Sequence, residues 1–239
     1  MSIQLSPLDE ERFGIPSARA TAPLIANDIP TALDFCHKNR VKFLFARCFT
    51  SDLAAAQAME RAGFLLMDTL LYFERRLPFP IPDTETTLRP VKSSEAQIVA
   101  QLATESFRGY GGHYHSDPRL DVARSDEVYS SWAYRSCMSR EVADEVLVAE
   151  IDSQIVGFVT LKVNSPLEGE VPLYGVSPAV QGQGIGRGLI IGALKWCTAQ
   201  KVERLLISTQ VTNLSSQKVW IRLGFEPTHS YYTFHKWFD

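Results

Sequence analysis

From residue 87 onward, the apolar positions switch between helical and strand periodicity. The longest helical pattern is Gly184–Gln200, in which Leu189, Ala193, Trp196 and Cys197 recur at helical spacing. Short apolar runs bounded by polar residues predict strands around it. The predicted strands are Thr87–Val91, Glu145–Ile151, Gln154–Val163, Glu170–Val176, Arg204–Thr209 and Tyr231–Trp237, and the other predicted helices are Ser93–Ser106, Glu127–Ser139 and one that is capped by Asn213 and ends at Gly224. This order indicates a mixed α/β domain.

A proline-rich segment precedes this domain. Pro78, Pro80 and Pro82 fall within Leu77–Thr87, where they cannot continue a helix or a central strand. The predicted parts of the chain are an N-terminal domain over residues 1–76, a linker over 77–86 and a larger domain over 87–239.

The N-terminal part repeats the pattern at the end of the chain. VKFLFARCFTSDLAAAQAMERAGFLLMDTLLYF, from Val41, aligns without gaps on VERLLISTQVTNLSSQKVWIRLGFEPTHSYYTF, from Val202. Both segments predict a strand, a capped helix, a glycine stop and a second strand. Either two such units coincide by chance, or the N-terminal part is a truncated copy of the C-terminal half.

Composition narrows the class of protein. The chain has 239 residues, is 45% hydrophobic and carries a net charge of -3, which favours a folded core and argues against a nucleic-acid partner. No run approaches the roughly 20 apolar residues of a membrane-spanning helix, and the start MSIQLSPLDEER lacks the features of a secretory signal. We therefore expect a cytoplasmic protein that acts on something small.

Cysteine and histidine give no metal signal. The four cysteines are far apart and form no CxxC pair, and the five histidines form no HExxH or similar motif. We predict neither a metal site nor a disulfide framework.

The strongest chemical signal is the loop VSPAVQGQGIGRG, Val176–Gly188. An apolar strand stops at Pro178, and a glycine-rich turn leads into a helix, so consecutive N–H groups can point into one space at a positive helix end. Such a turn suits a diphosphate; the alternative is a turn that merely allows close packing. The loop lacks the Gly-Lys-Ser/Thr of a P-loop, and the third glycine of the dinucleotide fingerprint is replaced by Arg187.

Together with the V-x-P before it and the Asn213–Phe225 unit after it, this loop resembles the acyl-CoA signature of the GNAT N-acetyltransferases. The resemblance covers Thr87–Phe238 and implies a central, mostly antiparallel sheet flanked by helices, with the N-terminal part as a partial repeat of that fold. It also implies acetyl-CoA or another acyl-CoA as donor, with backbone amides of the loop on the pyrophosphate and a splayed strand, Leu173–Val176, on the pantetheine arm. The residues that it assigns to donor binding are Tyr174, Gly175, Val176, Gln181, Gly182, Gln183, Gly184, Ile185, Gly186, Arg187, Asn213, Ser216 and Trp220.

Attack of a neutral amine on a thioester requires a base, and the leaving thiolate requires a proton. Glu170 stands where histone-type members of the family have their general base; the alternative is an ordinary carboxylate at the start of a strand. Trp220 stands where many members have a proton-donating tyrosine, and an indole cannot donate a proton at neutral pH. Either the thiolate leaves without an acid, or another group such as Tyr231, Tyr232 or a water supplies the proton.

The polar and aromatic segment Ser106–Trp132 lies where acyltransferases of this fold build the acceptor site. Its candidate acceptor-binding residues are Tyr110, His113, Tyr114, His115, Asp117 and Arg119. They could hydrogen-bond hydroxyls and a diphosphate, with aromatic rings against a base or sugar; the alternative is a surface loop whose polar groups satisfy one another.

The chain has a short N-terminal α/β part that opens with SPLDEERFGI (Ser6–Ile15), then a loop with the pattern D-P…Y-x-x-W, and then the CoA half. This layout is similar to that of bacterial TDP-fucosamine acetyltransferase and related sugar-nucleotide N-acyltransferases. The resemblance implies that the acceptor is the primary amine of a dTDP-linked amino sugar destined for surface polysaccharide. Open alternatives are a protein N-terminus, polyamine or drug amine as acceptor, and a non-catalytic CoA-sensing module. Whether the chain forms a homodimer is also open.

Overall fold

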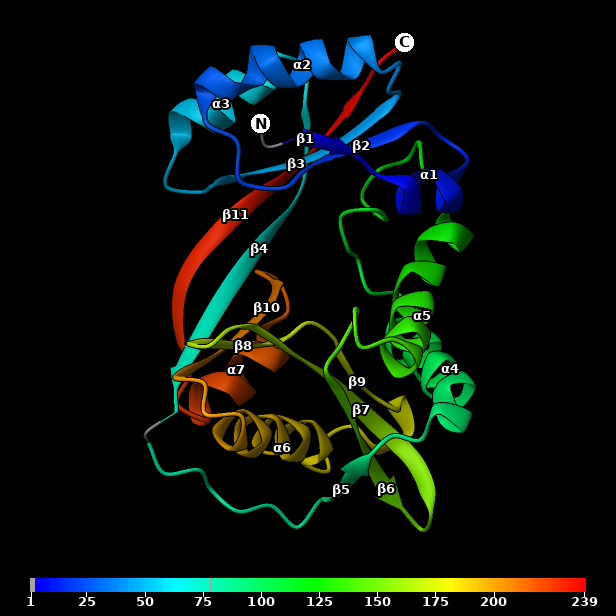
Figure 1. Cartoon of the computed structure of the whole chain (residues 1–239), viewed down its shortest axis with the longest axis vertical. Coiled ribbons are helices and arrows are strands. Elements are labelled where there is room, and N and C mark those ends of the chain that lie inside the picture. The colour runs from blue at the N-terminus through cyan, green and yellow to red at the C-terminus, as the bar shows by residue number, and fades with distance from the viewer. Residues whose placement is uncertain (1–2, 78) are drawn as a thin grey trace. The chain divides into compact units, whose positions relative to one another are not determined.

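The computed structural model describes residues 3–77 and 79–239; Pro78 of the predicted linker lies outside the described residues. The chain divides into two compact units (Figure 1). The first contains Met1–Leu71, Gly111–Ser125 and His229–Asp239, and the second contains Tyr72–Tyr110 and Asp126–Thr228.

The first unit has a mixed sheet whose strand order is β1, β2, β3, β11 and β4. Its elements are β1 (Ile3–Leu5), α1 (Pro7–Phe13), β2 (Ser17–Ala20), η1 (Ala26–Asp28), α2 (Ile29–Lys38), β3 (Phe43–Phe49), α3 (Leu53–Arg61), the first part of β4 (Leu65–Arg76) and the last part of β11 (Glu226–Trp237). β2 is parallel to β3, whereas β11 is antiparallel to β3, from Phe43 opposite Trp237 to Phe49 opposite Tyr231.

Successive side chains of β3 point to opposite faces of this sheet, and the two faces differ. Leu44, Ala46 and Cys48 point into a buried apolar cluster with α2 and α3, which cover that face (Figure 1). Phe43, Phe45 and Arg47 therefore lie on the other face, where Phe45 packs against His113 of the segment 111–125.

The first unit contains residues beyond the predicted N-terminal domain, residues 1–76. β3 finds its antiparallel neighbour in the last strand of the chain, because Tyr231–Trp237 pairs with Phe49–Phe43. The segment 111–125 also belongs to this unit.

The second unit has the strand order β4, β10, β8, β7, β6 and β5, and β9 pairs separately with β7. Its elements are β5 (Thr87–Pro90), η2 (Ser93–Glu95), α4 (Ala96–Ser106), most of α5 (Val122–Met138), β6 (Glu145–Ile151), β7 (Gln154–Ser165), β8 (Glu168–Val171), β9 (Tyr174–Val176), η3 (Pro178–Val180), α6 (Ile185–Ala199), β10 (Arg204–Gln210) and α7 (Leu214–Arg222). The sheet is mostly antiparallel, and β8 pairs with β10 in parallel.

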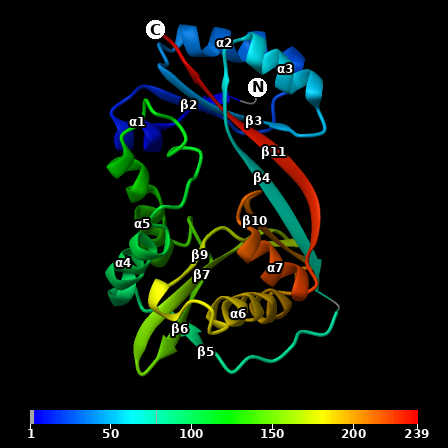
Figure 2. The same ribbon diagram turned by 180° about the vertical axis from the view of Figure 1, so that it is seen from behind.

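Helices cover both faces of this sheet. Phe158 of β7 packs with α4 and α5, whereas the neighbouring Gly157 faces Ile185 and Leu189 of α6. Figure 2 shows α4 and α5 separated from α6 and α7 by the strands.

Several predicted elements have different bounds in the structure. The predicted strand Tyr231–Trp237 begins earlier, as β11, at Glu226. The predicted strand Glu170–Val176 is two strands, because Pro172 has no N–H for the ladder and separates β8 from β9. The predicted helix Glu127–Ser139 begins earlier, at Val122, where the carboxylate of Asp121 accepts a hydrogen bond from the Arg124 N–H at 2.9 Å.

The repeat in the sequence is reproduced element by element. β3, α3 and β4 match β10, α7 and β11 at every bound with a constant offset of 161 residues. Asp52 and Asn213 cap the two helices by accepting from the N–H of Ala55 and Ser216, at 2.9 and 3.4 Å. The last strands are exchanged: β11 lies beside β3, and β4 lies beside β10.

Candidate active site

The glycine-rich loop forms an open backbone cradle at the start of α6. Gly182 and Gly184 adopt positive φ values of 81° and 86°, and a Cβ built on either meets no atom within 4 Å. The first helical hydrogen bond runs from the Gly188 N–H to the Gly184 carbonyl, at 2.9 Å. The preceding amides, Ile185–Arg187, therefore have no acceptor within the helix and point into the open space. The cradle fits a diphosphate.

Beside the cradle, the sheet of the second unit splays apart. β8 pairs with β10 as far as Val171 opposite Ile207, and after Pro172 the chain continues as β9, which pairs with β7. β10 runs on to Gln210. In the registers that the structure describes, the outer edge of β9 has no strand partner, so it can accept an extended ligand by backbone hydrogen bonding.

Polar side chains surround this opening. The Tyr174 hydroxyl of β9 donates to the Ser216 Oγ of α7 at 2.9 Å. Asn213 donates from Nδ2 to Thr209 Oγ1 at 2.9 Å, and the Tyr110 hydroxyl lies 3.2 Å from the same oxygen. Three predicted donor-binding residues and one predicted acceptor-binding residue, Tyr110, are thus brought together.

Trp220 belongs to the core rather than to a polar surface. It is completely buried, and its ring meets that of Phe73 edge-on with centroids 5.4 Å apart. The ring of Tyr174 lies 6.2 Å away. Tyr174 is the phenol beside this indole, and burial raises its pKa, while its contacts with Ser216 and Trp220 offset only part of the shift.

Glu170 lies on β8, with its side chain on the face opposite to that of Gly169. A Cβ on Gly169 would meet Cys197 of α6, so alternation puts Glu170 on the face that α4 and α5 cover. Asn164 Nδ2 donates to Glu170 Oε2 at 2.9 Å. This amide is a hydrogen-bond partner of the carboxylate.

The predicted proton donors Tyr231 and Tyr232 lie in the first unit. They pair with Phe49 and Cys48 of β3, and the Tyr231 ring packs on that of Phe49 with centroids 4.7 Å apart. Tyr232 packs against the apolar cluster under α2 and α3.

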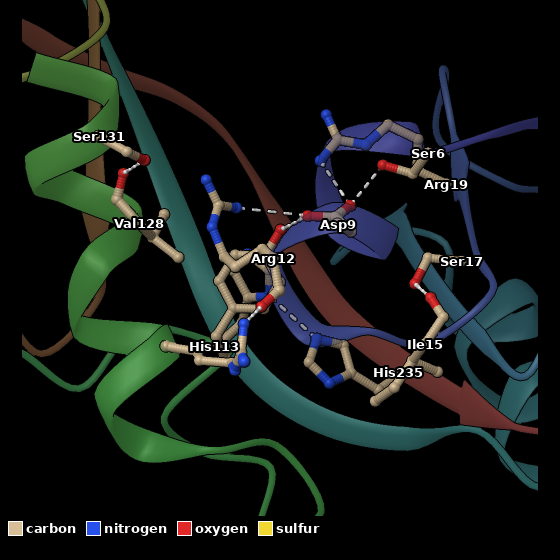
Figure 3. A network of polar contacts seen from close by, with 12 residues as sticks. Ser6, Asp9, Arg12, Ile15, Ser17, Arg19, His113, Val128, Ser131 and His235 are labelled. Carbon is tan, nitrogen blue, oxygen red and sulfur yellow. Dashed lines mark hydrogen bonds and ion pairs between the residues drawn. The ribbon is translucent and has the colours of Figure 1, made fainter. Parts of the chain in front are cut away.

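The other predicted acceptor residues, His113, Tyr114, His115, Asp117 and Arg119, also lie in the first unit. Tyr114 is buried and donates to Asp9 Oδ1 at 2.8 Å. Asp9 also accepts hydrogen bonds from Ser6 and from Arg19, and lies 3.5 Å from Arg12 (Figure 3). The fully buried Asp9 carboxylate is therefore compensated by two cations.

A second chain of contacts links Asp117, His235 and His113. Asp117 Oδ2 accepts from His235 Nδ1 at 2.7 Å and from Trp237 Nε1 at 2.9 Å. His235 Nε2 lies 2.9 Å from His113 Nδ1 (Figure 3). An ionised carboxylate only accepts, so a neutral His235 carries its proton on Nδ1 and accepts the Nδ1 proton of His113. Nε2 of His113 is then a hydrogen-bond acceptor.

The pKa values agree with this arrangement. Burial raises the pKa of Asp117, but hydrogen bonds from His235, the Arg119 N–H and Trp237 outweigh it and leave the pKa lowered. Burial, followed by the charges of His235, Arg47, Arg19 and His115, holds the pKa of His113 well below its usual value. This series of contacts therefore joins the ionised carboxylate of Asp117 to the neutral imidazole of His113.

Basic and aromatic groups adjoin His113 on the same face of the sheet. The guanidinium groups of Arg19 and Arg47 lie 5.7 and 5.0 Å from the centre of the Phe45 ring, on which His113 also packs. Arg119 lies 4.2 Å over the ring of Trp237. This face suits an anionic, ring-containing ligand.

Reading of the sequence missed Asp9, Arg19, His235 and Trp237. Their partners are remote along the chain, and His235 is separated from Asp117 by 118 residues. The available signal was a histidine in an aromatic-rich strand, Tyr231–Trp237.

The sheet splays apart beside a backbone cradle at the start of α6, and this arrangement is typical of an acyltransferase fold. Glu170 lies on the strand that precedes the cradle. The model of the acetyltransferase (GNAT) family matches residues 99–225. The chain belongs to the GNAT acetyltransferase family, as predicted.

Two curated relatives illustrate the range of this similarity. The spore coat polysaccharide biosynthesis protein SpsD of Bacillus subtilis (strain 168) is 23% identical over 203 residues, covering 82% of this chain and 66% of that protein. The mycothiol acetyltransferase of Nocardia farcinica (strain IFM 10152) is 33% identical over 191 residues, covering 74% of this chain and 59% of that protein. The chain spans less than two thirds of the length of these relatives.

A solved structure shows the same fold. The GCN5-related N-acetyltransferase of Sphaerobacter thermophilus superposes with a TM-score of 0.67 at 16% identity, covering 98% of this chain and 76% of that one. The predicted fold class is confirmed. Among the helices of residues 3–77 and 79–239, none has the length and apolar character needed to cross a membrane.

Proposed function

We propose that the protein is an acyl-CoA-dependent N-acyltransferase that transfers an acetyl group to the primary amine of a nucleotide-linked amino sugar, for surface polysaccharide synthesis. Acetyltransferases of the family use acyl-CoA in general. The observation that carries the proposal is the cradle at Gln181–Arg187 next to the free edge of β9. The proposal includes a cytoplasmic location for the enzyme.

The donor site uses mainly backbone groups. The amides of Ile185–Arg187 would hold the pyrophosphate, and the edge of β9 would hydrogen-bond the pantetheine amides. When bound, the donor supplies a thioester whose carbonyl carbon is attacked by the amine.

Gly184 of the donor site should not tolerate a side chain, because its φ is 86°. Gly184→Ala should weaken CoA binding at least tenfold, as measured by calorimetry. Gly111→Ala, in open space, should not weaken it.

Glu170 is the proposed base that takes a proton from the attacking ammonium group, and Asn164 orients it. Glu170→Gln should lower kcat by about 10²–10⁴-fold and leave CoA binding intact. Glu141→Gln, at an exposed site in the same unit, is the matched control. Equal rates for the two variants would remove Glu170 from the mechanism.

The acceptor proposal rests on two kinds of support. SpsD is named for polysaccharide biosynthesis, and the face of the first unit that carries Arg19, Arg47 and His113 is basic and aromatic. Tyr114 and Asp117 are buried and bonded within the unit, so in this proposal they position their neighbours. A second candidate acceptor is a mycothiol-type amine, because several relatives are mycothiol acetyltransferases.

One assay separates these acceptors. Purified protein is incubated with acetyl-CoA and a panel of dTDP-amino sugars, amino-sugar thiol precursors, polyamines and peptides, and free thiol is followed. We expect turnover with the sugar nucleotides. Turnover with another group alone overturns the sugar acceptor, and CoA binding without turnover on any amine indicates a binding module.

A further inference from the structure

A departing thiolate needs a hydrogen-bond donor, and few side chains at the opening of the sheet can supply one. Trp220 is completely buried against Phe73. The Tyr110 hydroxyl shares Thr209 with Asn213. Tyr174 is a phenol on the strand that forms one side of the opening, and its shorter hydroxyl contact, with Ser216, is a donated one.

We propose that the Tyr174 hydroxyl is the donor to the sulfur of the acyl-CoA, where it stabilises the leaving thiolate. This inference rests on the proposed function. The reaction balances as follows: the amine nitrogen bonds to the thioester carbon and gives a proton to the base, and the C–S bond breaks with its electron pair on sulfur. Tyr174 holds its Oη proton against that sulfur.

The position of Tyr174 joins both parts of the donor site. Its backbone lies in β9, opposite Val159 of β7, and so belongs to the free edge. A Cβ on Gly186 would lie 3.9 Å from Tyr174 Cε2, so the ring packs beside the start of α6. The hydroxyl reaches Ser216 of α7. The side chain thus runs from the cradle to the helix on the far side of the opening.

The contact with Ser216 supports a donor role. Tyr174 Oη donates to Ser216 Oγ at 2.9 Å, so its proton already points to an acceptor at rest. A sulfur that carries negative charge is a stronger acceptor than a serine hydroxyl, because hydrogen bonds to ionised groups are about twice as strong. We expect the proton of Tyr174 to turn from Ser216 to the sulfur as charge develops.

The pKa values decide between sharing and transferring this proton. A simple thiol has a pKa of about 8.5, and tyrosine has one of about 10 before any shift. Burial raises the pKa of Tyr174 further. Tyr174 therefore retains its proton and stabilises the thiolate through a hydrogen bond, and solvent protonates the sulfur later.

The test uses the titration of bound CoA rather than turnover alone. The thiolate absorbance of CoA is titrated in complex with the wild-type protein, with Tyr174→Phe and with Tyr134→Phe, which removes a half-exposed phenol of α5. Tyr174→Phe should raise the pKa of the bound thiol by about one unit and lower kcat by about 10–10²-fold, as expected for a lost bond to a charged group. Tyr134→Phe should match the wild type, and CoA affinity at low pH should be equal in all three.

Other outcomes have distinct meanings. Identical thiol titrations in the wild type and Tyr174→Phe would overturn the proposal. Ser216→Ala keeps the phenol and removes its resting acceptor, so the bound thiol should titrate at or below the wild-type pKa; an increase like that of Tyr174→Phe would make Ser216 the donor and overturn the proposal. If the titration shifts as expected while every amine fails as acceptor, the contact between Tyr174 and sulfur stands and the proposed transferase activity fails.

Discussion

At the scale of the residue, the first unit contains two imidazoles in an unusual setting. His235 is completely buried between Asp117 and His113, and the ring of His113 packs on Phe45. The groups that face His113 are His235 from β11, Arg47 from β3, Arg19 from β2 and His115 from its own segment. All of these can carry positive charge, so they oppose protonation of His113.

This setting predicts a loss of stability in mild acid. The pKa of His113 is lowered in the folded state, so below about pH 6.5 the unfolded chain takes up a proton that the folded chain does not. Stability should therefore fall as pH drops through this range, by up to about 1.4 kcal/mol per pH unit from this one group. Urea unfolding at pH 7, 6 and 5 measures the slope. His113→Gln should reduce it, whereas His37→Gln, at the exposed end of α2, should not. Equal slopes in the two variants would contradict the account.

A glycine in α6 gives a second prediction at this scale. A Cβ at Gly188 would collide with the side chain of Thr86, whereas one at Gly186 would make only ordinary contacts of 3.7 and 3.9 Å. Gly188→Ala should therefore lower the Tm in thermal unfolding. Gly186→Ala is the matched control, and it should keep or raise the Tm, because alanine favours a helix over glycine by about 1 kcal/mol. A Tm that rises in both variants would show that Thr86 moves away freely.

At the scale of the element, the two repeats use the same device to start a helix. Asp52 caps α3 with a 2.9 Å hydrogen bond, and Asn213 caps α7 with one of 3.4 Å. Each cap follows a strand that ends three residues earlier, at Phe49 or Gln210. The cap satisfies an N–H group that has no partner within the helix.

Asp52→Ala should remove this support from α3. We expect a loss of about 1 kcal/mol in the free energy of unfolding. Chemical denaturation measures it, with Ser51→Ala as the control at the preceding exposed position. A loss in the control as large as in Asp52→Ala would show that the turn as a whole, rather than the cap, carries the effect.

The elements also show how much of the fold the local sequence pattern can predict. β6 and α6 match the prediction closely because each is an apolar run with clear polar or glycine bounds. The break between β8 and β9 depends on which neighbour each strand pairs with, and that choice is made by β7 and β10, remote in the sequence. The cradle was predictable because its glycines alternate within one short stretch, Gly182–Gly188. The contacts that join Asp117, His235 and His113 were not predictable, because they connect two distant segments.

At the scale of the whole molecule, two strands serve both units. β4 begins in the first unit and ends in the second, and β11 begins in the second and ends in the first. Phe73 of β4 packs on Trp220, and Phe234 of β11 lies in the apolar cluster with α2 and α3. Each core therefore contains a side chain from the other repeat.

This sharing predicts that the two units unfold together. Burial raises the pKa of Cys36 in the first unit and of Cys197 in the second to about 12 each, so both thiols are inert in the folded state. In a urea series with pulsed thiol labelling, followed by mass spectrometry, both should become reactive at one midpoint. Labelling of either cysteine at a clearly lower urea concentration would show that its unit opens alone.

The exchange of β4 and β11 makes this chain the single-chain equivalent of a strand-swapped dimer. In such an arrangement each copy needs the strand of the other even where only one copy has the donor-binding loop. The second copy has the glycine-rich loop between β9 and α6, whereas the first joins β2 to α2 through TAPLIAND, which contains no glycine. A change that removed the first copy would therefore also remove β4 from the sheet of the second, even though the donor-binding loop lies in the second copy alone.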